Sequence, residues 1–208
     1  MKKLLLIIFL FLLNFMPAFA KASTEEEMQT FYQHKSQELA KNIIQDISDK
    51  KILEEGKPRM AIRGFIFGVF LENPAWQEQF KTTNLSLEVA VVIQDAKRLL
   101  NKDTTGYSNP DAIATWIVET KDLDWLWGIF FATGNPKIPE GIRLFIEKED
   151  IKAQEVHQGE SKKVHVINVT AMSAEWSMAA LAKKHPIVKA SVDKLRAKKL
   201  KIYKNYIN

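Results

Sequence analysis

Three carboxylates in this 208-residue chain lie beside tryptophans at a spacing that could support acid–base chemistry. Glu119, Asp122 and Asp124 occupy the junction of two apolar segments, close in sequence to Trp125 and Trp127. A glycan hydrolase uses two carboxylates beside an aromatic surface, with the pKa of one acid raised by burial. Helix capping explains the same residues more simply, because acids are favoured in the first turn of a helix. A cell-wall or glycan hydrolase is therefore the alternative hypothesis and not the leading one.

The four histidines form no recognisable catalytic or metal-binding motif. His157 and His165 are eight residues apart and could share one helical face, but solvated histidines in a polar connection explain them more simply. His185 precedes Pro186, where an imidazole can bond the last carbonyls of a helix. The chain has no cysteine, no H-E-x-x-H, no G-x-S-x-G and no phosphate-binding loop. We therefore expect no catalytic residues, no metal site and no cofactor.

The strongest binding feature is a basic segment at the C-terminus. The chain has 30 basic and 25 acidic residues, and nine basic residues but a single acid, Asp193, lie from residue 183 onward. Residues 21–182 carry a net charge of −5. On a helix, Leu195, Ile202 and Tyr206 share one side, so these apolar groups can dock while the cations face solvent. The candidate binding residues of this segment are Lys194, Arg196, Lys198, Lys199, Lys201 and Lys204.

Three kinds of partner suit such a tail: the acidic body of the same protein, an anionic membrane surface, or an acidic partner protein. We favour the membrane surface or the partner protein, and we expect no nucleic acid because the chain carries an export signal. A solvated lysine-rich helix end is the plain alternative. Trp76, in the most polar helix, is the tryptophan expected to reach the surface, and it joins the binding candidates.

The first twenty residues predict a signal peptide. Lys2 and Lys3 form a positive n-region, residues 4–13 are an unbroken apolar run, and Ala18-Phe19-Ala20 fits the small-x-small cleavage rule. Such a run is short for a membrane span of about 20 residues, which leaves an uncleaved anchor as the alternative. We expect cleavage after Ala20 and a protein that works in the periplasm or is secreted.

Apolar periodicity and capping signals predict an all-α fold, a single domain of packed antiparallel helices for which a solenoid-like array is one arrangement. The expected divisions are a signal peptide at 1–20, a helical domain at 21–188 and a basic C-terminal helix at 189–208. Helices are expected over 25–49, 58–71, a short segment from 74, 85–100, 110–119, 123–133, a segment from 139, 161–184 and 186–204, with loops at 101–109 and a loop or frayed helix at 150–160.

The segment Asp122–Asn135, DLDWLWGIFFATGN, is expected at the centre of the core. Its apolar side chains surround the helix axis, and a helix that is apolar all round is normally buried on most sides. Asp122 can cap the start of this helix, and Gly134 followed by Pro136 can end it.

Two further features predict which helices are neighbours. The short link between 110–119 and 123–133 predicts that these two helices pack antiparallel. Gly64 and Gly68, four residues apart in the segment 58–71, predict close packing of this helix against another one.

Two stretches carry a resemblance. Trp127–Asn135 (WGIFFATGN) and Ala174–Val188 (AEWSMAALAKKHPIV) resemble motifs of an uncharacterised group of small exported bacterial proteins, and together they cover about one eighth of the chain. The resemblance implies a bacterial exported protein, and it transfers no activity and no functional residue. The leading hypothesis is an exported helical protein that acts by binding a protein or an envelope partner.

Overall fold

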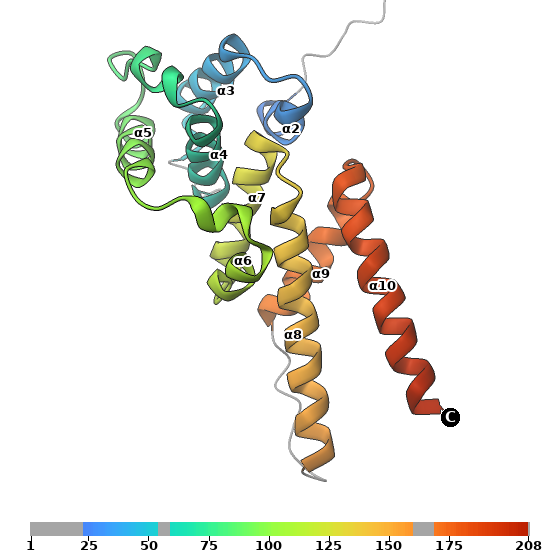
Figure 1. Ribbon diagram of the computed structural model, residues 1–208. Coiled ribbons are helices and arrows are strands. Elements are labelled where there is room, and N and C mark those ends of the chain that lie inside the picture. The colour runs from blue at the N-terminus through green and yellow to red at the C-terminus, as the bar shows by residue number, and fades with distance from the viewer. Residues whose placement is uncertain (1–22, 54–58, 160–168, 208) are drawn as a thin grey trace, which may run out of the picture.

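The computed structural model describes residues 23–53, 59–159 and 169–207, and for residues 152–159 and 200–207 it places the backbone alone (Figure 1). All regular elements within these ranges are helical and share one hydrophobic core, which confirms the all-α single domain. The elements are α2 (Thr24–Thr30), the 3-10 helix η1 (Phe31–Gln33), α3 (Gln37–Asp49), α4 (Arg59–Glu72), η2 (Pro74–Gln79), α5 (Leu87–Leu100), η3 (Thr105–Ser108), α6 (Pro110–Trp116), α7 (Thr120–Thr133), α8 (Lys137–Gly159), α9 (Val169–Leu181) and α10 (Pro186–Ile207).

The centre of the fold is the pair formed by α4 and α7, which make the most extensive helix–helix contact among the described residues. A Cβ on Gly68 would lie 2.8 Å from the Cβ of Ala132, and one on Gly64 would overlap the carbonyl of Trp125. The two helices therefore approach until their backbones touch. This confirms that the segment 122–135 is central and that the two glycines of α4 serve close packing.

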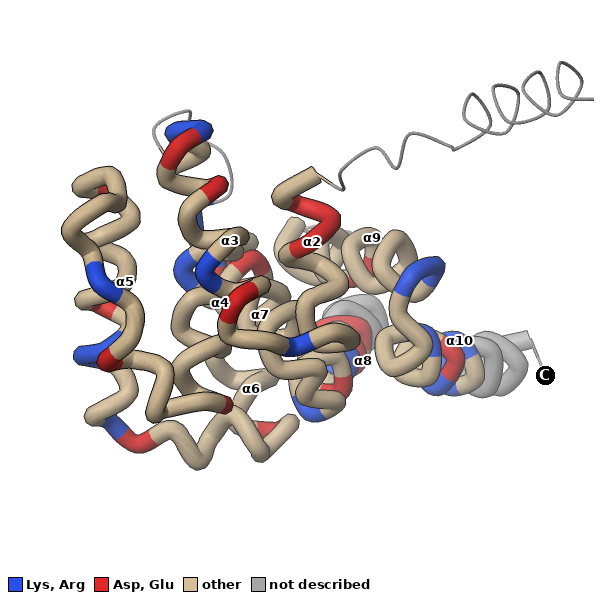
Figure 2. Tube along the Cα trace, turned by 90° about the horizontal axis from the view of Figure 1, so that it is seen from above, with Lys and Arg blue, Asp and Glu red and all other residues tan. Residues whose placement is uncertain are grey.

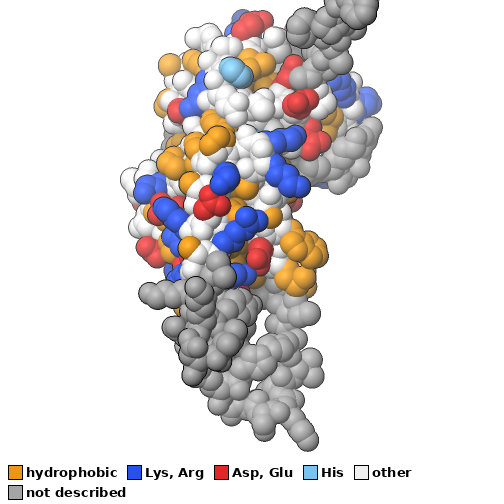
Figure 3. Space-filling view, turned by 90° about the vertical axis from the view of Figure 1, so that its right-hand side faces the viewer, with side chains coloured by type: hydrophobic (Ala, Val, Ile, Leu, Met, Phe, Trp, Pro, Cys, Tyr) orange, Lys and Arg blue, Asp and Glu red, His pale blue; other side chains and the backbone are white. Residues whose placement is uncertain are grey.

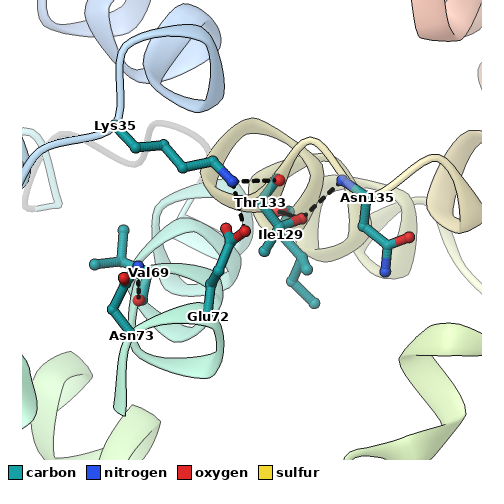
Figure 4. Close-up of polar contacts among 7 residues, drawn as sticks. All are labelled: Lys35, Val69, Glu72, Asn73, Ile129, Thr133 and Asn135. Carbon is teal, nitrogen blue, oxygen red and sulfur yellow. Dashed lines mark hydrogen bonds and ion pairs between the residues drawn. The ribbon is translucent and has the colours of Figure 1, made fainter. Parts of the chain in front are cut away.

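Lys35 shows how the central pair is oriented (Figure 4). Its Nζ donates to a carboxylate oxygen of Glu72 at 2.5 Å and to the carbonyl oxygen of Thr133 at 2.8 Å. Glu72 is the last residue of α4 and Thr133 the last of α7, so the two C-termini lie at the same end and the central helices run parallel. A cation at this position offsets the negative ends of both helix dipoles.

The prediction that helix 110–119 packs against helix 123–133 is wrong. α6 packs chiefly against α8, where a Cβ on Gly141 would lie 2.9 Å from the carbonyl oxygen of Pro110. The reason is local: α6 ends at Trp116, and the link is not a tight turn, because Ile117 and Glu119 have extended backbones.

The single helix expected over 25–49 is broken. α2 ends at Thr30, and α3 begins only after Ser36, whose hydroxyl accepts a hydrogen bond from the backbone N–H of Leu39 at 3.0 Å. Ser36 satisfies a free donor of the new helix, so capping here outweighs the continuing apolar periodicity. At 150–160 the backbone stays helical through Gly159 as the end of α8.

The C-terminal helix begins at Pro186, directly after His185, as the proline predicts. Its Val188, Val192 and Leu195 are buried in the common core, so the expected boundary at residue 189 falls inside a helix that belongs to the domain. The predicted signal peptide at 1–20 and residues 161–168 of the helix expected over 161–184 lie outside the described residues.

Helices that are consecutive in the sequence also pack together: α4 with α5, α8 with α9, and α9 with α10. This part of the fold has the arrangement of a stacked helical array, whereas α4 and α7 pack together although other elements separate them in the sequence. Within the described ranges, no helix combines the length and the apolar character needed to cross a bilayer.

Candidate binding surface on α9 and α10

The three carboxylates of the hydrolase hypothesis do not form a pair. Asp122 is the third residue of α7 in a capping box, where its Oδ2 accepts hydrogen bonds from the backbone N–H groups of Val118 at 3.0 Å and Glu119 at 2.8 Å. Glu119, and not Asp122, is the N-cap, and its exposed carboxylate pairs with Lys121 at 3.0 Å. α7 thus starts one turn earlier than the sequence suggested.

Asp124 points away from Asp122, because two residues along a helix correspond to a rotation of about 200°. Desolvation by the surrounding protein raises the pKa of the Asp124 carboxyl. A raised pKa suits a general acid, but no second carboxylate of this group faces it, so the arrangement lacks the partner that glycoside hydrolysis requires.

A pocket of about 390 Å³ lies between α4, α5 and the start of α7. Arg63, Asp95, Arg98, Asp122 and Trp125 supply its polar and aromatic lining. Its charges are largely satisfied internally, because Asp95 pairs with Arg63 at 3.2 Å and with Arg98 at 3.1 Å. The pocket can hold a small molecule against an apolar wall, and it presents no free nucleophile or base.

Two of the predicted binding lysines bind the protein itself. Lys198 on α10 pairs with Glu147 of α8 at 2.6 Å, and the Glu147 carboxylate, only 6% exposed, also pairs with Arg143. Lys199 pairs with Glu175 of α9 at 2.8 Å and with Asp150 of α8 at 3.3 Å.

Burial alone would lower the pKa of Lys199, but the hydrogen bond to Glu175 and the charge of Asp150 outweigh it and raise the pKa. Lys198 and Lys199 therefore fix α10 on the acidic body, one of the three partners expected for the tail.

The other basic candidates differ in position. Lys194 and Arg196 are exposed on α10 and have no acidic partner among the described residues. Arg196 lies about 200° around the helix from Lys198, on the flank away from that contact with α8. Lys201 and Lys204 belong to the last turns of α10, where the structure describes the backbone and not the side chains. Among its described side chains, α10 thus presents two free cations, Lys194 and Arg196, on a helix that ion pairs hold in place.

Trp76, the tryptophan expected at the surface, is only partly exposed, and Trp116 and Trp176 are more exposed. Trp76 lies on η2 and packs against the core as a partly buried side chain, whereas Trp176 on α9 is 68% exposed. The sequence prediction of a surface tryptophan named Trp76 and missed Trp176. The signal that could have identified it is spacing, since Val169, Met172 and Trp176 recur at three and four residues on a face opposite the buried Ala174 and Met178.

His185 is a core residue and not a cap. Its ring is fully buried among Tyr32, Phe130 and Phe131, with Nδ1 3.1 Å from the Tyr32 hydroxyl. Nε2 is buried without a hydrogen-bond partner among the described residues, and the backbone N–H, not the ring, bonds the Leu181 carbonyl. Burial, aided by the charge of Lys184, lowers the pKa of the imidazole.

Metal ligation finds no support in the described part of the chain, where no three histidine or acidic side chains gather around a common point. The side chain of His157 and all of His165 lie outside that part.

Comparison with known proteins adds no assignment to this geometry. No protein-family model, no curated protein and no solved structure matches the chain.

Proposed function

We propose that this protein is an exported helical protein that acts by binding an acidic partner of the cell envelope, a protein or an anionic membrane surface, through the unpaired cations of α10, Lys194 and Arg196. Export is inferred from residues 1–20 of the sequence alone.

One observation carries the proposal: Lys194 and Arg196 are exposed and have no described acidic partner, while their neighbours Lys198 and Lys199 are held by Glu147, Glu175 and Asp150. Ion pairs that fix the helix leave Lys194 and Arg196 on a rigid support. Fixed, unpaired charge of one sign steers association with a surface of the opposite sign.

The hydrolase alternative has less support. Asp122 is engaged in the capping box, Glu119 pairs with Lys121, and Asp124 points away from Asp122. Two carboxylates across an open cleft would favour hydrolysis, and these three side chains do not supply them.

The test compares binding of the purified protein to immobilised polyglutamate and to anionic phospholipid vesicles, at low and at physiological salt. The double variant Lys194→Glu/Arg196→Glu should bind each surface at least about tenfold more weakly than the unaltered protein. Binding of the unaltered protein should weaken as salt is added, because charges are screened over about 8 Å at physiological ionic strength.

The matched control is Lys81→Glu/Lys102→Glu, which changes two exposed lysines near the ends of η2 and α5 and alters the net charge equally. Equal loss in both double variants would show that only total charge matters, and absence of binding to both surfaces would also reject the proposal. Deleting residues 189–208 is not a usable test, because Val192 and Leu195 belong to the core.

A further inference from the structure

α9 exposes an apolar face that no described part of the protein covers. Val169 is 66% exposed, Met172 37% and Trp176 68%, while Ala174 and Met178 on the opposite side are fully buried. Spacings of three and four residues place the exposed three on one stripe of the helix. A surface helix normally turns polar side chains outward, so a second apolar side indicates a contact beyond the described residues.

The apolar stripe continues onto the link before α7. Val118 is 73% exposed, and its carbonyl oxygen accepts a hydrogen bond from the Thr170 hydroxyl at 3.5 Å, which places the link beside the first turn of α9. We call Val118, Val169, Met172 and Trp176 the α9 patch. Figure 3, which looks at the side of the molecule that carries α10, shows apolar side chains gathered at one edge with basic side chains nearby.

Basic residues are in excess along the chain from the α9 patch onward. Residues 169–199 contain seven basic residues and two acids, and both acids are paired, Glu175 with Lys199 at 2.8 Å and Asp193 with Lys189 at 2.6 Å. Lys183 and Lys184 are exposed in the turn that leads from α9 to α10, where Figure 2 shows a basic segment. The unpaired charge of residues 169–199 is therefore basic.

The charge decides which occupant fits. A second copy of the chain would bring the same free lysines to the same apolar surface, where like charges repel. An anionic phospholipid surface offers negative head groups to the lysines and an apolar layer to the patch. Tryptophan is favoured at that boundary, because its ring prefers the apolar side and its N–H the polar side.

We infer that the α9 patch inserts into the outer layer of an anionic phospholipid membrane while Lys183, Lys184 and the free cations of α10 contact the head groups. The assignment rests on the binding role proposed above and names its partner.

The test uses vesicles of phosphatidylcholine alone or mixed with phosphatidylglycerol, and measures the protein that sediments with them. The unaltered protein should bind the mixed vesicles, and the double variant Met172→Ser/Trp176→Ser should bind about tenfold more weakly, because it loses the apolar anchor. The matched control is Leu87→Ser, which removes a side chain that is 75% exposed on α5, outside the patch. All variants share residues 1–22, so any lipid binding by that segment is common to them.

A second measurement reports insertion directly. Phosphatidylcholine brominated on its acyl chains should quench the fluorescence of the bound protein, and Trp176→Phe should remove most of that quenching while binding persists. Trp116→Phe, which changes a half-exposed tryptophan outside the patch, should leave the quenching unchanged.

The outcomes separate this inference from the binding role beneath it. If Lys194→Glu/Arg196→Glu abolishes vesicle binding but Met172→Ser/Trp176→Ser does not, the role of α10 stands and insertion of the α9 patch is rejected. The same conclusion follows if polyglutamate binds and vesicles do not. A dimer that dissociates on dilution and is lost in Met172→Ser/Trp176→Ser would assign the patch to a second copy and overturn the inference.

Discussion

Gly128 of α7 lies directly against the carbonyl oxygen of Ala61 in α4, so close that no Cβ fits between them. A Cβ at residue 128 would also lie 2.7 Å from the amide nitrogen of Phe65. Both atoms belong to the backbone of α4, which cannot move aside as a side chain can. The closeness of the two central helices therefore depends on the absence of a side chain at this residue.

Gly128→Ala should lower the free energy of unfolding by about 3 kcal/mol or more, because the added methyl forces α4 and α7 apart. Chemical denaturation measures the loss. Gly106→Ala is the control, since its Cβ would meet only the ring of Trp116, which is half-exposed and can shift. A Gly128→Ala variant as stable as this control would contradict the close packing of the central pair.

Trp127→Ala should cost about 3–5 kcal/mol of stability. Trp127 is 5% exposed, and its Nε1 donates a hydrogen bond to the Ser177 hydroxyl at 3.1 Å, so the change removes both core packing and a link from α7 to α9. Trp176→Ala should change stability by less than about 0.5 kcal/mol, because its ring is exposed. A loss below about 1 kcal/mol for Trp127→Ala would show that α7 is not central.

Glu147→Ala should destabilise the protein by about 3–5 kcal/mol, because it leaves the largely buried Arg143 guanidinium without its carboxylate. Lys198→Ala should cost less than about 1 kcal/mol, since the lysine is partly solvated and Arg143 still balances Glu147. The double variant Arg143→Met/Glu147→Met should regain most of the loss, because no uncompensated charge stays buried. Urea denaturation of the three variants tests this order.

Acid should destabilise the fold through His185. Its pKa is lowered in the folded state, so above the ordinary value of about 6.5 the residue is neutral in both states and contributes no pH dependence. As the pH falls below that value, the unfolded chain binds the proton first, and stability decreases until the lowered pKa of the folded state is reached.

The measurement is the free energy of unfolding from pH 7.5 to pH 5 for the protein and for His185→Gln. The variant should start less stable, because it loses the aromatic contacts, and should show a smaller loss of stability on acidification. Parallel pH profiles would show that His185 does not titrate differently in the folded state.

The local elements follow from the sequence wherever capping and breaking residues agree with apolar spacing. Asn109 caps α6 at the end of the loop predicted over 101–109, Gly134 ends α7 in the left-handed conformation with a φ of 67° as predicted, and Pro186 starts α10 as predicted. These signals act over a single helical turn, so the chain around them is sufficient to specify them. The helix break before Ser36 was missed because one capping hydroxyl outweighed a periodicity that continued past it.

The pairing of the helices, and with it the set of apolar and charged groups that stay exposed, depends on long-range packing. The sequence shows that α7 and α9 each carry apolar side chains on several sides, but which of these sides are buried depends on the neighbouring helices. α7 is enclosed by α4 and other elements, whereas α9 has one side without a described neighbour and exposes Trp176 to solvent. The same holds for the tail, where Lys198 and Lys199 find acids 51 and 24 residues away and Lys194 and Arg196 find none among the described residues. Such distinctions arise from contacts between segments distant in the chain, and no local pattern of residues encodes them.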